Sequence, residues 1–412
     1  MIQRHNFEER LRAAVVAAGF SLELEPHALA SLTYAQESRV KKSVIAEHLR
    51  YSLGPDVPWS FVPSPKPRHY RTTSRRIVRN ARTSSYLAFA NGAPTAPSVL
   101  EPEEHGKVFA YVSEVLKDRR NAFAKVLQHV IVRGTYDEHV VIFNVHELDA
   151  DIVRAARSAI AAVQQLVPSV RHAWLYVDPR RSRYYLDSDR LFSGVQQKRM
   201  TGESVWRQSV NDISFQVGVF SFSQVNLSIL DTFASTVVAM ADVRPGDAMA
   251  DLYCGYGLFA AHVSDVASSI VAIDADATTV ANARYVLQRR KARAKAIAAR
   301  VTPTSLRSAI RSMDVAIIDP PYSGPDEGVI EAVGSFGPRR VVQVYCNAND
   351  VRRCTQSWKR AGYTPVSATV FDMFPGTLDI EIAVSYAKQE PTPNVTSRQP
   401  KQRSQRSGGR RS

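Results

Sequence analysis

Apolar and polar residues follow one another along the C-terminal part of the chain in blocks that predict strands separated by helices. Short apolar runs fall at residues 248–252, 269–273, 315–318, 340–344, 366–371 and 380–386. Most of the stretches between them carry apolar residues at helical spacing. Strands that alternate with helices pair in parallel, so we predict a doubly wound α/β sheet over residues 215–387, with ligands at the carboxyl ends of its strands.

The first part of the chain predicts a small helical element. Phe7, Leu11 and Val15 recur at helical spacing, which indicates an amphipathic helix. Residues 54–67 contain five prolines and are typical of an extended linker. We therefore expect residues 1–65 to form a helical element that ends in a proline-rich linker.

The middle of the chain, residues 66–214, predicts a separate α+β unit, because short strands and helices alternate there. Strands are expected at 126–133, 140–145 and 171–177, and helices at 101–127 and 152–166. At the far end, residues 388–412 are dominated by Pro, Gln, Ser, Arg and Gly. Such a composition cannot bury a core, so it predicts a disordered tail.

The net charge of the chain indicates the kind of partner that it binds. The formal net charge is +14, and the tail, with seven Lys or Arg and one Glu, contributes +6 of it. The remaining +8 indicates a polyanionic partner, and nucleic acid fits best. No apolar run approaches the roughly 18 residues of a membrane span. Three cysteines cannot form a disulfide framework, which favours a reducing cytoplasm. Nothing in the pattern indicates an oligomeric state.

Two segments concentrate the basic residues. Residues 66–82 and residues 284–300 each contain seven Lys or Arg and no acid. In the first, we expect a strand edge that faces a phosphate backbone, and a solvated basic surface is the alternative. In the second, an exposed helix face is favoured over a phosphate contact.

The glycine turn at residues 254–257 carries the first candidate chemistry. It follows a predicted strand and precedes a helix, and the next strand ends in Asp274. This is the layout of a nucleoside-binding βαβ unit, in which glycines admit the ligand and the acid accepts the ribose hydroxyls. Ala260 stands where the dinucleotide fingerprint has a third glycine. The turn therefore favours S-adenosylmethionine over NAD, and a plain tight turn is the alternative.

Three further motifs follow predicted strands of the same sheet. They are Asp319-Pro320-Pro321-Tyr322, Cys346-Asn347, and residues 372–381, which read DMFPGTLDIE. Taken singly, each has an ordinary interpretation. A cysteine at a strand end can be a small buried apolar residue, and Glu381 alternates with apolar neighbours as a solvent-facing strand residue would.

Taken together and in order, the motifs resemble the RNA uracil-5 methyltransferase family of the class I S-adenosylmethionine-dependent enzymes. The matching segments in residues 215–386 are FSFSQVN, DLYCGYGLF, AIDAD, DPP, YCN and DMFPGTLDIE. The segment PKPRHYRTTSRR and the strand pair around LQHVIVRG also look like the family's central RNA-binding domain. The resemblance thus implies a class I methyltransferase fold at 215–387 and an RNA-binding role for 66–214.

The resemblance also implies roles for single residues. Cys346 would be the nucleophile and Glu381 the general base, with S-adenosylmethionine as the methyl donor and tRNA or rRNA as the partner. The cofactor would contact the residues Gln224, Tyr253, Gly255, Gly257, Asp274 and Asp319. No Cys/His ligand spacing occurs, so neither a metal nor an iron–sulfur cluster is expected.

Three positions depart from the family pattern: Tyr322 replaces an Arg, Leu258 an Asn and Ala348 a Pro. Asp-Pro-Pro-Tyr is the signature of amino methyltransferases, which modify an exocyclic nitrogen of a flipped base, so such an enzyme is an alternative. A catalytically silent RNA-binding relative is another. An amino methyltransferase needs neither a cysteine nucleophile nor a distal base, so the retained Cys346 and Glu381 favour uracil-5 methylation.

Overall fold

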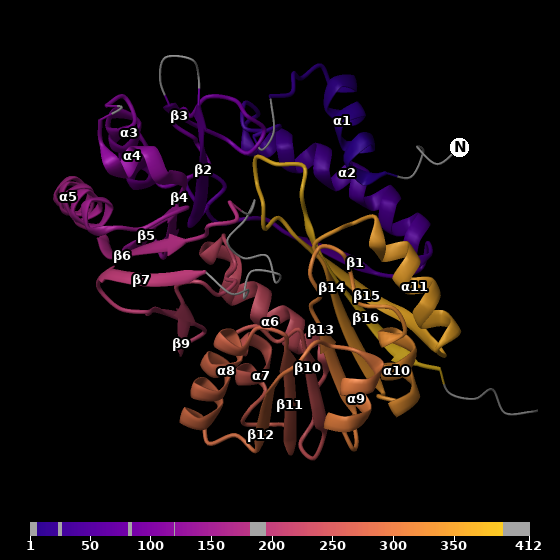
Figure 1. The fold of residues 1–412 in the computed structure, drawn as a ribbon. Coiled ribbons are helices and arrows are strands. Elements are labelled where there is room, and N and C mark those ends of the chain that lie inside the picture. Colours follow the sequence, from indigo (N-terminus) through magenta and orange to yellow (C-terminus); the bar gives the residue numbers. More distant parts are fainter. Residues whose placement is uncertain (1–5, 24–26, 81–84, 119, 182–194, 390–412) are drawn as a thin grey trace, which may run out of the picture.

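The computed structural model describes residues 6–23, 27–80, 85–118, 120–181 and 195–389. The chain forms one lobe on an eight-stranded sheet and a second lobe on a six-stranded sheet, with two N-terminal helices beside them (Figure 1). From residue 390 onward, the predicted tail lies outside the described residues. Within them, no helix is long and apolar enough to cross a membrane.

The larger sheet has the strand order β1-β15-β16-β14-β13-β10-β11-β12. Its neighbours pair in parallel except where β16 runs antiparallel between β14 and β15. The strands are β1 (Trp59–Val62), β10 (Ala248–Leu252), β11 (Ser269–Asp274), β12 (Ala294–Ala298), β13 (Val315–Ile318), β14 (Arg340–Tyr345), β15 (Tyr363–Phe371) and β16 (Glu381–Lys388). This architecture confirms the predicted α/β fold, including the strands predicted at 248–252, 269–273 and 315–318.

Helices cover both faces of this sheet, as the nearly continuous apolar strands require. In β13, Val315 and Ile317 pack toward one core, and Ala316 and Ile318 pack toward the other. The covering helices are α6 (Leu230–Ala241), which follows the short turn η3 (Leu227–Ile229), α7 (Leu258–His262), α8 (Ala277–Arg289), α9 (Pro303–Ala309), α10 (Val329–Phe336) and α11 (Asp350–Arg360). Buried strands with helices on both sides leave only strand ends accessible to a ligand.

The smaller sheet has the order β3-β2-β4-β5-β6-β7 and forms the second lobe (Figure 1). Its elements are β2 (Thr73–Asn80), β3 (Ser85–Ala88), α3 (Glu103–Val115), α4 (Ala122–Val126), β4 (Leu127–Gly134), β5 (His139–Val145), α5 (Ala150–Leu166), β6 (Val170–Val177) and β7 (Gln196–Thr201). A hairpin of β8 (Val205–Val210) and β9 (Ile213–Gly218) follows. Val130 and Val132 pack under the helices of this lobe, whereas Ile131 faces the core shared with the larger lobe.

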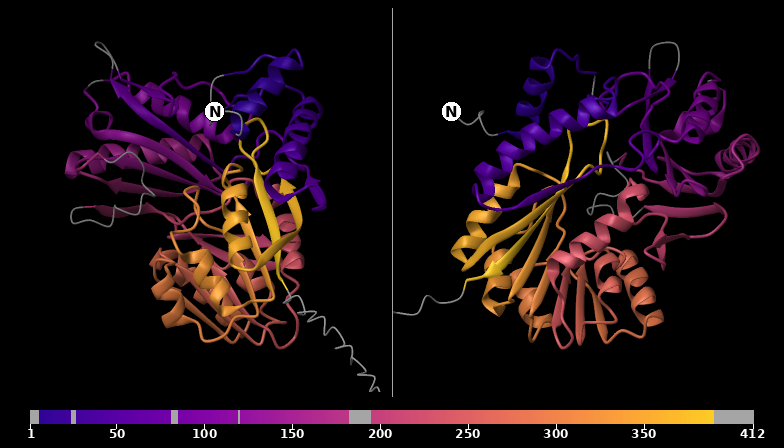
Figure 2. Two further views of the ribbon diagram at one scale, coloured as in Figure 1. Left: turned by 90° about the vertical axis from the view of Figure 1, so that its right-hand side faces the viewer. Right: turned by 180° about the vertical axis from the view of Figure 1, so that it is seen from behind.

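The N-terminal helices α1 (Phe7–Ala17) and α2 (Tyr34–Leu53) pack against the larger lobe (Figures 1 and 2). A capping box between Thr33 and Gln36 starts α2. Leu49 and Leu53 join the same apolar core as Val351 of α11. The chain then enters the larger sheet through β1, which pairs in parallel with β15.

Two expectations about basic segments were wrong. Residues 284–300 form the end of α8 and then β12, so only their first part is helical. The segment 66–82 contains β2, which lies between β3 and β4 and is no sheet edge. Arg76 in that strand is buried against Glu101, with Arg76 Nη2 2.7 Å from Glu101 Oε2. A basic run therefore did not indicate a uniformly exposed strand.

Candidate active site

Five of the predicted site residues lie at the ends of adjacent strands of the larger sheet. Asp274 is the last residue of β11 and Glu381 is the first of β16, while Tyr253, Asp319 and Cys346 directly follow β10, β13 and β14. These strands are neighbours in the order β16-β14-β13-β10-β11. Strand pairing therefore places these five residues in one row along a single edge of the larger sheet.

The register of β14 and β16 brings Cys346 and Glu381 together. The two strands run antiparallel, and their last pair at this end is Tyr345 with Ile382. The next residues on each strand are Cys346 and Glu381, which consequently face each other. Glu381 is almost completely buried, and Cys346 is half-buried. A thiol and a carboxylate thus share one end of two paired strands.

Most of the ionisable side chains in and beside this row are acidic. Burial raises the pKa of Asp319 to about 7, with a further contribution from Asp274. Burial, then Asp319 and Asp379, raises the pKa of Glu381 well above its ordinary range. Burial, then Glu381 and Asp319, also raises the pKa of the Cys346 thiol. Perturbed groups that gather at a sheet edge are typical of an active site.

The glycine turn has the close backbone approach that a nucleoside needs. Gly255 N–H donates to Asp274 Oδ2 at 3.0 Å, so the turn and the end of β11 are tied together. Gly255 has φ +52°, and a Cβ there would meet nothing nearer than the Thr279 methyl at 4.0 Å. A Cβ on Gly257, at φ +86°, would lie 3.1 Å from the Ala283 Cβ. Gly257 thus permits helix packing, while the space above Gly255 is open.

Sequence reasoning did not single out Asp251, the first residue of the motif DLYCGYGLF. Its side chain is completely buried and accepts a hydrogen bond from Ala260 N–H at 2.9 Å. Its Oδ1 has no hydrogen-bond partner among the described residues. Burial raises the pKa of Asp251 to about 7, despite the Ala260 hydrogen bond. A charged residue in an otherwise apolar buried strand was the signal that could have identified it.

Gln224 does not lie on a strand end but on the segment between β9 and η3. That segment is held by Arg133 of β4, whose guanidinium donates to the Ser221 carbonyl at 2.6 Å and the Ser223 hydroxyl at 2.8 Å. Thr72 N–H donates to the Val225 carbonyl at 2.9 Å. The smaller lobe therefore positions the segment that carries Gln224.

Two small, open cavities meet at Cys346. Tyr322 lines both and is 56% exposed, and Phe7 and Glu8 of α1 line the larger one. The N-terminal helix therefore contributes part of the wall around the thiol, which its sequence did not indicate.

The two other departures from the family pattern are structural. Leu258 is buried in the core at the start of α7, and Ala348 is buried with its carbonyl 2.8 Å from His48 Nε2. The remaining cysteines, Cys254 and Cys354, are buried. No cluster of three or more potential metal ligands occurs among the described residues.

Comparison with known proteins identifies a methyltransferase domain. Residues 211–335 match the family model "Methyltransferase small domain". A Streptomyces coelicolor protein named an uncharacterized RNA methyltransferase is 29% identical over 44% of this chain and 40% of its own length. One from Halalkalibacterium halodurans is 23% identical over 69% of this chain and 62% of its own.

A relative with a stated activity is the 23S rRNA (uracil(1939)-C(5))-methyltransferase RlmD of Yersinia enterocolitica. It is 30% identical over 41% of this chain and 39% of its own length. The chain thus spans 39% to 62% of the length of these three curated relatives.

The fold resembles that of the Pyrococcus abyssi tRNA (uracil-54, C5)-methyltransferase, solved with S-adenosyl-L-homocysteine. The TM-score is 0.66 at 18% identity, over 88% of this chain and 86% of that one. The fold, the matched domain and the named relatives agree with the ordered motifs. The chain therefore has a class I methyltransferase fold and is similar to proteins named RNA methyltransferases.

Proposed function

We propose that this protein transfers a methyl group from S-adenosylmethionine to carbon 5 of a uridine in RNA. The observation that carries the proposal is the placement of Cys346 opposite Glu381 at the end of β14 and β16. An acidic row and the open glycine turn lie on the neighbouring strands. The names of the relatives support RNA as the substrate class, and tRNA and rRNA are both compatible with the site.

The residues present fit this cofactor. Asp274 stands at the strand end beside the open space above Gly255, where ribose hydroxyls can be accepted. Burial and neighbouring acids raise the pKa values of Asp319 and Asp274, so the site favours a cationic ligand such as a sulfonium. Gln224 and Tyr253 complete the proposed binding set. When bound, the cofactor supplies an electrophilic methyl group.

The first step assigned to the protein is covalent. Cys346 is half-buried and lines both cavities, so its thiol can lose a proton to water. The thiolate sulfur then forms a bond to carbon 6 of uracil, and the C5=C6 electron pair moves onto carbon 5 and the O4 enolate. Carbon 5 thereby becomes a nucleophile.

The second step belongs to Glu381. Once carbon 5 carries both a methyl group and a proton, the Glu381 carboxylate takes the proton. The C5–H electron pair restores the C5=C6 double bond, and the C6–S bond breaks to return the thiolate. Burial raises the pKa of Glu381, which makes its carboxylate a stronger base than an exposed one.

Trapping the covalent adduct tests the proposal. RNA containing 5-fluorouridine should form a complex with the protein and S-adenosylmethionine that survives a denaturing gel, because fluorine at carbon 5 cannot leave as a proton. Cys346→Ala should abolish the band, whereas Cys354→Ala, a buried cysteine of α11, should leave it unchanged. A band that persists in Cys346→Ala, or no band with RNA that the protein methylates, would contradict the mechanism.

One observation favours a second candidate. Tyr322 follows Asp319-Pro320-Pro321, is largely exposed and lines both cavities, and an amino methyltransferase would stack its flipped base on such a ring. Mass spectrometry of nucleosides from RNA incubated with the protein separates the two activities. We expect 5-methyluridine, and an N-methylated adenosine, cytidine or guanosine would favour the second candidate. RNA binding without methylation would indicate a silent relative.

A further inference from the structure

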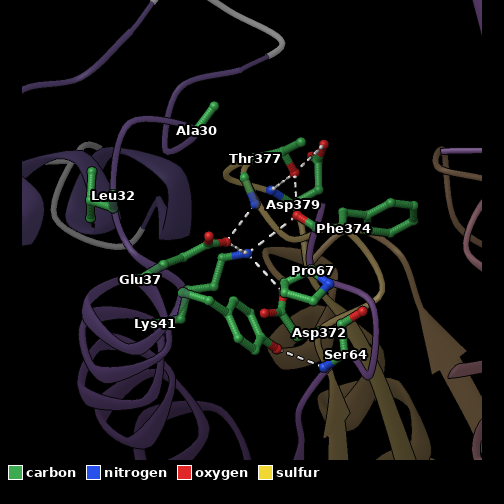
Figure 3. Close-up of polar contacts among 12 residues, drawn as sticks. Ala30, Leu32, Glu37, Lys41, Ser64, Pro67, Asp372, Phe374, Thr377 and Asp379 are labelled. Carbon is green, nitrogen blue, oxygen red and sulfur yellow. Dashed lines mark hydrogen bonds and ion pairs between the residues drawn. The ribbon is translucent and has the colours of Figure 1, made fainter. Parts of the chain in front are cut away.

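A buried cluster of charges joins α2 to the loop that leads to Glu381. Lys41 Nζ lies 2.8 Å from Asp372 Oδ1 and 2.8 Å from Glu37 Oε1, and it donates to the Phe374 carbonyl at 3.3 Å (Figure 3). The side chains of Lys41, Glu37 and Asp372 are completely buried. An ammonium has three donors, and here each one has an acceptor.

Glu37 fixes the same loop further along. Its Oε1 accepts the Gly376 N–H at 2.6 Å, and its Oε2 lies 3.2 Å from Arg68 Nη1. The Gly376 carbonyl in turn accepts Leu29 N–H at 3.0 Å. Gly376 has φ +83°, and a Cβ there would lie 2.4 Å from Leu100 Cδ2. Both sides of this residue are therefore tied to the N-terminal element.

These contacts bracket the connection between the two strands that end at the site. Asp372 directly follows β15, and Glu381 begins β16, with Phe371 and Glu381 paired across the sheet. Lys41 holds the loop at Asp372 and Phe374, and Glu37 holds it at Gly376. Within the loop, Thr377 Oγ1 donates to the Phe374 carbonyl at 2.9 Å and accepts Asp379 N–H at 3.1 Å. The path from residue 372 to residue 380 is thus fixed along much of its length.

We propose that Lys41 and Glu37 are positioning residues for Glu381, so that the N-terminal helix α2 is part of the catalytic apparatus. The inference rests on the proposed function. Neither side chain lines the cavities at Cys346, and both act through the loop 372–380. A buried charge cluster is weak evidence for stability, because its desolvation cost offsets the attraction, and such clusters better serve a specified geometry.

One step of methylation, the release of the product, depends on the position of the Glu381 carboxylate. Adduct formation needs the Cys346 thiolate, whereas release needs the Glu381 carboxylate within reach of the proton on carbon 5. A misplacement of about 1 Å can slow a reaction about 10²-fold. If α2 positions Glu381, loss of Lys41 should leave adduct formation largely intact and slow release, so that methylated RNA remains bound to the protein.

The experiment compares two substrates in single turnover. Lys41→Met should accumulate the covalent complex on ordinary uridine RNA with S-adenosylmethionine, as Glu381→Gln should if Glu381 is the base. We expect release to slow by roughly 10²-fold, from the geometric argument above, while trapping by 5-fluorouridine RNA continues at a rate near that of the unsubstituted protein. The matched control is Lys42→Met, an exposed neighbour on α2 whose ammonium lies over the Phe61 ring.

A second variant guards against misfolding. Lys41→Met combined with Asp372→Asn removes one charge of each sign and leaves Glu37 paired with Arg68. The positioning role would be overturned if folded Lys41→Met released its product at an unchanged rate. It would also be overturned if the rates of trapping and of release fell equally, or if both variants failed to fold. The proposed function fails separately, if the unsubstituted protein forms no Cys346-dependent adduct with 5-fluorouridine RNA.

Discussion

Two groups of buried carboxylates lie near the loop 372–380, and they differ in the groups that neighbour them. Glu37 and Asp372 are paired with the ammonium of Lys41. Glu381 and Asp319 neighbour the Cys346 thiol and further acids. Both groups are removed from water, so burial alone does not distinguish them.

The two groups of carboxylates differ in whether they are paired with a cation. Burial alone would lower the pKa of Lys41, but Asp372 and Glu37 more than offset it, and the resulting pKa is above the ordinary value. Lys41 therefore keeps its charge inside the cluster. In the other group, burial raises the pKa values of Asp319 and Glu381, and neither forms an ion pair with a cation among the described residues. Unpaired buried acids indicate chemistry, and paired ones indicate a fixed geometry.

Stability measurements should separate the two groups most strongly. Lys41→Met leaves two buried carboxylates without their ammonium and should lower the free energy of unfolding by roughly 3–5 kcal/mol. Glu381→Gln should leave it unchanged or raise it at pH 8. The pKa of Glu381 is higher in the folded protein than in the unfolded chain, so between these two pKa values the folded protein binds more protons. The free energy of unfolding therefore falls as the pH rises through this range. Glutamine does not titrate, so Glu381→Gln removes this fall.

Urea unfolding followed by fluorescence measures both changes. The exposed Lys42→Met should shift the free energy of unfolding by less than about 0.5 kcal/mol. If Lys41→Met and Lys42→Met were equally stable, the buried cluster would have no role in holding the loop.

The reactivity of Cys346 tests the unpaired group. Burial and the carboxylates of Glu381 and Asp319 raise the pKa of the thiol, so alkylation by iodoacetamide in the absence of ligands should be slow at pH 7. The rate should rise by about tenfold per pH unit up to pH 9, because thiolate is the reactive form. Asp319→Asn and Glu381→Gln should each accelerate alkylation at pH 8, since removal of a like charge lowers the thiol pKa.

Peptide mapping by mass spectrometry assigns the modified cysteine, and Cys346→Ser provides the blank. Alkylation that already reaches a plateau below pH 8 would show that the thiol is activated in the free protein. In that case the acidic row would not control it.

The sequence predicted one group and not the other for a physical reason. Cys346, Asp319 and Asp274 lie at strand ends, and the parallel order of a doubly wound sheet brings such ends together. Glu37 and Lys41 are an i,i+4 pair on a helix, which in a sequence has the pattern of an ordinary exposed pair. Their burial depends on Asp372, 331 residues away, and no local pattern indicates that contact.

The same reason explains the corrections in the basic segments. The side chains of β2 alternate between the two faces of the smaller sheet, so one basic run contains both Arg76, buried against Glu101, and exposed Arg79. Charge alone does not tell which face is buried. The short strand β12 likewise lies within a basic stretch that a composition argument assigns to a helix.

The smallest expected effect comes from comparing substitutions of the buried Arg76 and the exposed Arg79 in β2. If the exposed part of β2 contacts phosphate, Arg79→Ala should reduce the slope of log K for RNA binding against log salt by about 0.9 and weaken binding to all sequences similarly. Its free energy of unfolding should change by less than about 0.5 kcal/mol. Arg76→Ala should instead destabilise the protein, because it leaves Glu101 buried without its partner. Filter binding between 50 and 200 mM salt measures the slope, and an unchanged slope in Arg79→Ala would leave β2 as a solvated basic surface with no phosphate contact.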